Sequence, residues 1–162
     1  EMQFRVSKLL NKKATGLPWL GTFHSISAKL LRKHADAVGL KSNFSIIDQA
    51  DQERLIKNIC KAENVDIKKI SPKYILAIID KWKNKGHYPQ NVILKRKDPL
   101  EKNFLKIYKI YQQKLIDLNA ADFSDLILHT VKIFEKYKDI AELYSRKFFS
   151  KGFFFFKITL SG

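Results

Sequence analysis

Apolar residues recur at intervals of three and four along most of the chain, which is the spacing of one face of an amphipathic helix. The pattern is clearest over residues 99–118, where it is sustained for about five turns. We therefore predict a long helix there, with an apolar face made of Leu100, Phe104, Ile107, Tyr108, Tyr111, Leu115 and Leu118.

Polar residues that can cap a helix stand directly before four apolar stretches. They are Asp48, Ser71, Asp98 and Asp122, and proline follows the second and third. We predict that the helix opened by Asp48 runs to about residue 62, and that Gly86 ends the one opened by Ser71. With further amphipathic segments at 25–38 and 140–148, the chain is predicted to be an all-α helical bundle.

Three short segments have the composition of strands instead. Residues 18–23 are apolar and run directly into a helix, so we predict a strand-loop-helix junction, and residues 44–47 predict a brief extended segment. The tail from Phe153 to Phe156, together with Ile158, is apolar and rich in β-formers. We expect this tail to be a strand of a sheet whose other strands lie outside the chain, and otherwise to be disordered or paired with a neighbouring molecule.

Composition and charge narrow the classes of function. A chain of 162 residues with 45% hydrophobic side chains suffices for one folded domain with a core. Its 31 Lys and Arg against 16 Asp and Glu leave a net charge of +15, which favours polyanionic partners such as nucleic acid. The single cysteine, Cys60, excludes a disulfide framework and a thiolate metal site. No apolar run reaches the roughly 18 residues that span a bilayer, so we expect no membrane partner.

Motifs for catalysis or cofactor binding are missing from the sequence. The histidines, His24, His34, His87 and His129, lie in different segments without the spacing of metal ligands. There is no glycine-rich phosphate loop and no G-x-S-x-G nucleophile turn. We therefore expect no metal site, no catalytic residue and no nucleotide site within this chain.

Basic residues cluster in the middle of the chain. Residues 68–114 hold thirteen Lys and Arg against three acids. Lys81, Lys83 and Lys85 lie close together in one predicted helix, and residues 95–97 form a continuous basic run. Such a face suits the phosphates of DNA, although each of these lysines can equally be the solvated side of an amphipathic helix.

A second candidate contact is the sequence Gly21-Thr22-Phe23-His24-Ser25 at the predicted strand-helix junction. Its hydroxyl, aromatic and imidazole side chains can bond to phosphates and stack on bases, and a helix N-terminus attracts anions. The alternative is an ordinary capped helix whose Phe23 belongs to the core.

The segment from Thr22 to Ser25, followed by a helix with Leu30-Leu31-Arg32, resembles the TFHS motif of superfamily 1 DNA helicases of the UvrD, PcrA and Rep type. Ala121-Asp122-Phe123-Ser124-Asp125-Leu126 is similar to the family's DF-x-DL segment. The resemblance covers about residues 1–148. Between the two motifs, the family's other landmarks agree in order: Phe44-Ser45-Ile46-Ile47-Asp48, Asp51-Gln52, Lys83 to Gly86 followed by Pro89, and Tyr108 with Tyr111.

The resemblance implies a domain organisation. In this family a RecA-like motor domain, 1A, is interrupted by a helical accessory domain, 1B. Residues 1–23 would be a border of 1A, residues 24–148 would be domain 1B, and residues 149–162 would be a divergent apolar tail. The expected fold is therefore a 1B-like helical bundle with short strand remnants of domain 1A at both ends.

The resemblance also implies roles for individual residues. Thr22, Phe23, His24 and Ser25 would line the track of the single DNA strand. Asp122, Phe123 and Asp125 would form a structural motif in which the two acids cap and orient the chain and take no part in catalysis.

The sequence departs from the family where the motor chemistry would lie. No Walker A loop is present, and residues 149–162 stand in place of the Walker B strand with its magnesium-binding acids. We therefore expect that this chain alone hydrolyses no ATP, and that ATP and Mg²⁺ are cofactors only of a full-length parent.

The function expected from the resemblance is that of a DNA-binding accessory fragment of an ATP-dependent 3′–5′ helicase that acts in DNA unwinding and repair. Its partners would be single-stranded and duplex DNA and the motor domains, in the bacterial cytoplasm. One alternative is a degenerate or adaptor-like helical module that binds another protein. Another is the helicase part of a RecB- or AddA-like helicase-nuclease.

Overall fold

The computed structural model describes residues 18–94 and 98–149. Three expectations fall outside these ranges: the motor-domain border before residue 18, the basic run at 95–97, and the apolar tail from residue 150.

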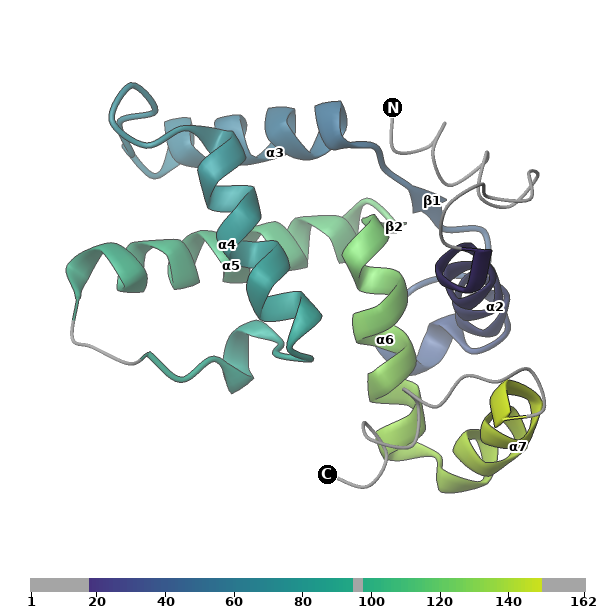
Figure 1. The fold of residues 1–162 in the computed structure, drawn as a ribbon. Helices are drawn as coiled ribbons and strands as arrows, with labels where there is room; N and C mark the ends of the chain where they lie inside the picture. The colour runs from purple at the N-terminus through teal and green to yellow at the C-terminus, as the bar shows by residue number, and fades with distance from the viewer. Residues whose placement is uncertain (1–17, 95–97, 150–162) are drawn as a thin grey trace.

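The described chain is mostly helical and contains one small parallel sheet (Figure 1). The prediction of a helical fold is confirmed, and the sheet is an addition to it. None of the described helices is long and apolar enough to cross a membrane. In chain order the elements are α2 (Pro18–Lys33), the 3-10 helix η1 (Ala35–Val38), β1 (Ser45–Ile46), α3 (Gln49–Ala62), α4 (Pro72–Asn84), the 3-10 helix η2 (Pro89–Asn91), α5 (Pro99–Asp117), β2 (Ala120–Ala121), α6 (Phe123–Lys136) and α7 (Lys138–Phe149).

The four predicted capping residues all accept a hydrogen bond from the backbone of the first turn that follows them. Asp48, Ser71, Asp98 and Asp122 accept from the backbone N–H groups of Asp51, Tyr74, Leu100 and Asp125, at 2.8, 3.2, 2.9 and 2.8 Å. Local sequence therefore fixes the starts of α3, α4, α5 and α6.

The predicted strand at residues 18–23 is wrong, because α2 already begins at Pro18. Proline suits the first helical position, where its missing N–H and fixed φ cost nothing. The predicted helix 25–38 is also interrupted, since α2 ends at Lys33 and the chain continues as η1 up to Gly39, whose φ is +80°. Glycine adopts this left-handed conformation without steric cost.

The predicted extended segment at 44–47 is confirmed as β1, which pairs in parallel with β2. Ser45 lies opposite Ala120, and Ile46 opposite Ala121. Strand β2 was not predicted, because two alanines are too short for a periodic signal. This pairing carries the chain from the end of α5 to the start of α6.

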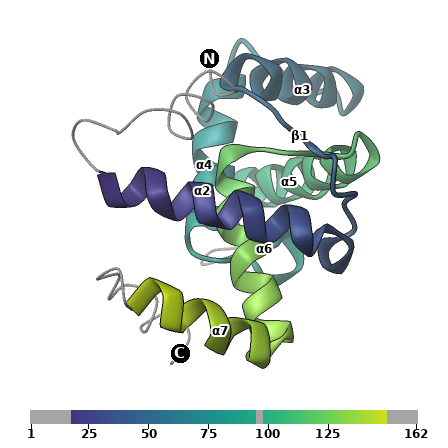
Figure 2. The ribbon, with the colours of Figure 1, turned by 90° about the vertical axis from the view of Figure 1, so that its right-hand side faces the viewer.

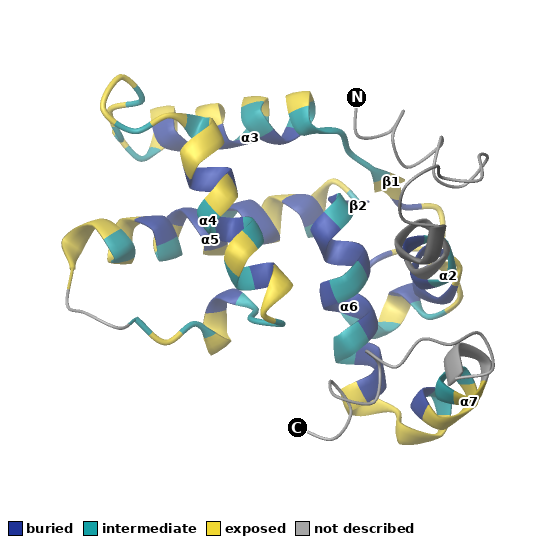
Figure 3. Cartoon of the chain, in the orientation of Figure 1, coloured by how far each residue is buried: buried dark blue, intermediate teal, exposed yellow. Residues whose placement is uncertain are grey.

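The helices enclose two hydrophobic cores, and Figures 1 and 2 show the two groups of helices that form them. The first core lies among α2, η1, α6 and α7, and the second among α3, α4 and α5. Figure 3 shows the buried faces of α5 and α6 turned toward the interior. The largest buried members of the first core are Leu30, Leu31, Leu40, Phe44, Leu126, Ile133 and Phe134, and those of the second are Ile56, Ile59, Ile75, Leu76, Ile79, Phe104, Ile107, Tyr108, Tyr111 and Leu115.

Candidate nucleic-acid interface

The first turn of α6 is held by a reciprocal capping box. The Asp122 carboxylate accepts from the backbone N–H of Asp125 at 2.8 Å, and the Asp125 carboxylate accepts from the backbone N–H of Asp122 at 3.1 Å. Both side chains are completely buried. The predicted capping role of these two acids is therefore confirmed.

Lys83 of α4 meets these two carboxylates inside the protein. Its ammonium group donates to Asp122 Oδ2 at 2.6 Å and to Asp125 Oδ1 at 2.9 Å, and none of the Lys83 side chain is exposed. We call Lys83, Asp122 and Asp125 the ion-pair cluster.

The prediction that Lys83 contacts DNA is corrected by this burial, because its ammonium group is enclosed and bonded to carboxylates. Lys81 and Lys85 are exposed, as a phosphate contact requires. The sequence already distinguished Lys83 from the two exposed lysines. Lys83 lies four residues after Ile79 and so continues the apolar face of α4, whereas Lys81 and Lys85 do not continue that face.

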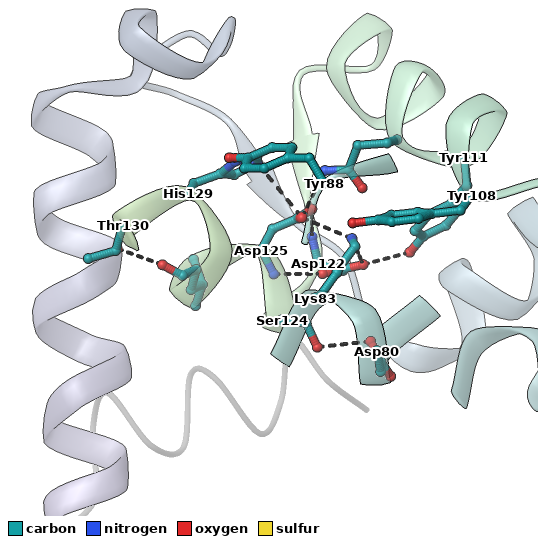
Figure 4. Close-up of polar contacts among 12 residues, drawn as sticks. Asp80, Lys83, Tyr88, Tyr108, Tyr111, Asp122, Ser124, Asp125, His129 and Thr130 are labelled. Carbon is teal, nitrogen blue, oxygen red and sulfur yellow. Dashed lines mark hydrogen bonds and ion pairs between the residues drawn. The ribbon is translucent and has the colours of Figure 1, made fainter. Parts of the chain in front are cut away.

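Three further buried side chains complete the polar network around the cluster, and Figure 4 shows one of them, Tyr111, beside Asp122. The Tyr111 hydroxyl donates to Asp122 at 2.9 Å and accepts from the Gln52 amide at 3.0 Å. The Gln112 amide donates to Asp125 Oδ1 at 2.9 Å. Sequence reasoning placed Tyr111 on an apolar face but missed its hydroxyl contacts and both glutamines, because these bonds join residues from three helices, α3, α5 and α6.

Burial and the charges of the neighbouring groups set the protonation state of each residue in the ion-pair cluster. Burial alone would lower the pKa of Lys83, but the adjacent Asp122 and Asp125 carboxylates raise it above its usual value. Burial likewise opposes ionisation of Asp125, yet Lys83 and then His129 bring its pKa below the usual range. The pKa of Asp122 is raised by its burial and by the Asp125 charge. Lys83 and Asp125 therefore form a charged pair at neutral pH.

A tyrosine-histidine pair flanks the cluster. The Tyr88 hydroxyl lies 2.6 Å from His129 Nδ1, and His129 Nε2 lies 3.8 Å from Asp125 Oδ1. Burial lowers the pKa of His129 and raises that of Tyr88. The phenol and the imidazole are therefore both neutral and share one hydrogen bond between Oη and Nδ1. An open pocket of about 270 Å³ lies beside this pair and is also lined by Lys109 and Gln112.

A second carboxylate of α4 lies at the edge of the network. Asp80 accepts a 2.8 Å hydrogen bond from the Ser124 hydroxyl in the first turn of α6. Its burial and the nearby Asp122 charge raise its pKa to about 6. Lys83, which bonds to Asp122 and Asp125, offsets only part of this increase in the Asp80 pKa.

The Thr22 to Ser25 segment lies within α2 and not at its start, because the helix begins four residues before Thr22. The proposed use of a helix N-terminus as an anion site is therefore wrong for this segment. The His24 ring is 7% exposed and stacks on the Phe123 ring at 4.0 Å between centroids, with 11° between the planes. The structure thus joins two of the predicted motifs, TFHS and DF-x-DL, through one ring contact.

Within the described ranges, no three His, Cys, Asp or Glu side chains are grouped so as to hold a metal ion. The predicted residues fall into three places. His24 of α2 stacks on Phe123 of α6. The ion-pair cluster of Lys83, Asp122 and Asp125 lies in the interior of the protein. Lys81 is exposed on α4, and Lys85 is exposed directly after it.

Known proteins match this chain along most of its length. Residues 1–150 match the UvrD/REP helicase N-terminal domain. The chain is 36% identical over 148 residues to the ATP-dependent DNA helicase PcrA of Staphylococcus epidermidis and 37% identical to that of Staphylococcus aureus. These matches cover 91% of this chain but only 20% of each relative's length. The chain therefore belongs to the UvrD/REP helicase N-terminal domain family.

Proposed function

We propose that this chain is the DNA-binding accessory region, domain 1B, of an ATP-dependent 3′–5′ DNA helicase that acts in unwinding and repair. The observation that carries the proposal is the match to relatives named ATP-dependent DNA helicases over 91% of the chain. In this proposal the motor chemistry, with its ATP and Mg²⁺, belongs to other parts of the parent protein, because the sequence holds no phosphate loop.

The charge distribution supports contact with a nucleic-acid backbone. Lys73, Lys81 and Lys85 are all exposed: Lys73 lies in the first turn of α4, Lys81 in its last turn, and Lys85 directly follows the helix. The chain as a whole carries a net charge of +15. Lysines that neutralise phosphates release condensed counterions, which favours binding to any DNA sequence. The α4 surface is therefore the proposed duplex contact, and the TFHS segment of α2 is the proposed single-strand contact.

The role of α4 is tested by reversing Lys81 and Lys85 to Glu and leaving buried Lys83 unchanged. The chain should bind DNA with a dissociation constant of about 10⁻⁴ to 10⁻⁶ M, and the double reversal should weaken it about tenfold. The slope of log affinity against log salt should become shallower by about two, since two phosphate contacts are lost. Fluorescence anisotropy with labelled duplex and single-stranded DNA over a salt series measures both quantities.

The matched control is the double reversal of Lys136 and Lys138, two exposed lysines at the junction of α6 and α7. It changes the net charge equally and should have a much smaller effect. Equal losses from the two double variants would contradict the proposed α4 contact. A folded chain that binds no DNA even at low salt would favour the protein-binding adaptor instead.

The single-strand assignment is tested separately with Thr22→Ala and Ser25→Ala combined. If these hydroxyls bond to a strand backbone, single-strand affinity should fall about threefold to tenfold and duplex affinity should change less than twofold. His24 is left unchanged, since its ring stacks on Phe123 and its loss would disturb the packing of α2. Equal loss on both DNA forms would remove the single-strand assignment.

A further inference from the structure

The ion-pair cluster lies between the two hydrophobic cores. Among the described residues, the fully buried members of the first core include none from α3, α4 or α5, although the half-buried Ile116 of α5 packs against it, and those of the second core include none from α6. Lys83 is supplied by the α3–α5 half, whereas Asp122 and Asp125 belong to α6. The two halves of the molecule are therefore joined at this point by charge and hydrogen bonds.

The bonds that the Asp122 and Asp125 carboxylates accept across this joint share one direction, whereas the Ser124 hydroxyl of α6 donates the other way, to Asp80 of α4. Lys83, Tyr111 and Gln112 donate from the α3–α5 half, and the Asp122 and Asp125 carboxylates accept on α6. Hydrogen bonds depend on angle as well as distance, whereas apolar contacts are largely non-directional. Such a set of bonds fixes how α6 is oriented against α4 and α5.

The joint is linked directly to the proposed strand contact. Phe123 lies between the two acids in the first turn of α6, and its ring stacks on His24 of α2. A rotation of this turn would therefore move the ring that packs against the TFHS segment. The path from Lys83 to α2 runs through one salt bridge, one helical turn and one ring contact.

We propose that the ion-pair cluster is a positioning device that holds the strand-binding helix α2 in a fixed orientation to the basic helices α3 to α5. Lys83, Asp122 and Asp125 are then positioning residues that act on DNA through α2 and never touch it. The stability of the fold does not by itself require charged side chains in this cluster, because a buried ion pair can often be replaced by neutral groups without loss of stability. The proposal rests on the proposed function for its effect on DNA.

The test uses a neutral triple variant of the 162-residue chain, Lys83→Met with Asp122→Asn and Asp125→Asn. Methionine is close to lysine in length, and asparagine still caps the helix, so packing and the start of α6 are preserved. Spin labels on Lys33→Cys and Lys57→Cys report the distance between α2 and α3, and labels on Lys57→Cys and Lys114→Cys report a distance within one half. Cys60 is completely buried and does not compete for the label.

The neutral triple variant should keep its circular dichroism spectrum and a cooperative unfolding transition. The distance distribution between the halves should become roughly twice as wide, and the distribution within one half should not change. Single-strand affinity should fall about fivefold or more, while duplex affinity should change less than twofold. If the triple variant does not fold, Asp125→Asn alone leaves one lysine facing one carboxylate and should show the same changes to a smaller degree.

Two outcomes would overturn the positioning role. One is a folded neutral variant whose distance distribution between the halves stays as narrow as that of the unaltered chain. The other is a broadened distribution with unchanged single-strand affinity. If the unaltered chain binds no single strand at all, the proposed function fails, and the distance measurements still decide whether the cluster orients the two halves.

Discussion

Replacing Lys83 with methionine should lower the free energy of unfolding by about 3–5 kcal/mol. The substitution keeps the length of the side chain but leaves the Asp122 and Asp125 carboxylates buried, close together and without a cation. An uncompensated buried charge costs far more than the loss of an exposed ion pair. Since a domain of this size has a total stability of about 5–15 kcal/mol, the variant should be only marginally folded at 37 °C.

Lys81→Met and Lys85→Met are the matched controls for this prediction. Both lysines belong to or directly follow α4, and both are exposed, so each change should stay within about 0.5 kcal/mol of the unaltered chain. Urea unfolding followed by circular dichroism measures all three variants under the same conditions. Similar stability of Lys83→Met and the two controls would show that Lys83 does not hold the buried carboxylates as the structure has it.

The contrast among these three lysines shows what the sequence could and could not predict. They look equivalent as a basic cluster in one helix, and all three were expected to bind DNA. The apolar stripe that continues from Ile75 and Ile79 to position 83 already separated Lys83 from the others. What the sequence could not give were its partners, because Asp122 and Asp125 are 39 and 42 residues away along the chain.

Helix starts were predictable because capping chemistry is local. Asp122 and Asp125 were correctly predicted as capping residues from their place before an apolar stretch and from the DF-x-DL resemblance. The same local argument failed at residues 18–23, where strand-forming residues lie in a helix that opens with proline. The stack of His24 on Phe123 was not predictable from local pattern, since it depends on how α2 crosses α6.

The buried network also predicts a pH dependence that centres on Asp80. Its carboxyl has a pKa of about 6 in the folded protein against an ordinary value of 3.8, owing to burial first and the Asp122 charge second. An acid whose folded pKa is raised contributes stability while it is protonated. That stability is fully present below about pH 4 and is lost as pH rises through about 6.

Asp80→Asn should therefore stabilise the chain at pH 7 to 8 and have little effect near pH 4. The pKa shift corresponds to at most about 3 kcal/mol, and we expect about 1–2 kcal/mol because solvent screens part of this carboxylate. The asparagine oxygen can still accept the hydrogen bond from Ser124, so the variant removes the charge and keeps the contact.

Urea unfolding at pH 4, 5, 6, 7 and 8 tests this prediction as the difference between the variant and the unaltered chain. Taking the difference cancels the pH effects that the two proteins share, whereas the coupling of Asp80 to Asp122, Asp125 and Lys83 is part of the measured change. The difference should grow between about pH 4 and pH 6 and then level off, because Asp80 is then ionised in both the folded and unfolded states. Asp36→Asn, at an exposed acid in η1, is the control. A pH profile for Asp80→Asn no steeper than that of the control would mean that the Asp80 carboxylate is not destabilised by its neighbours.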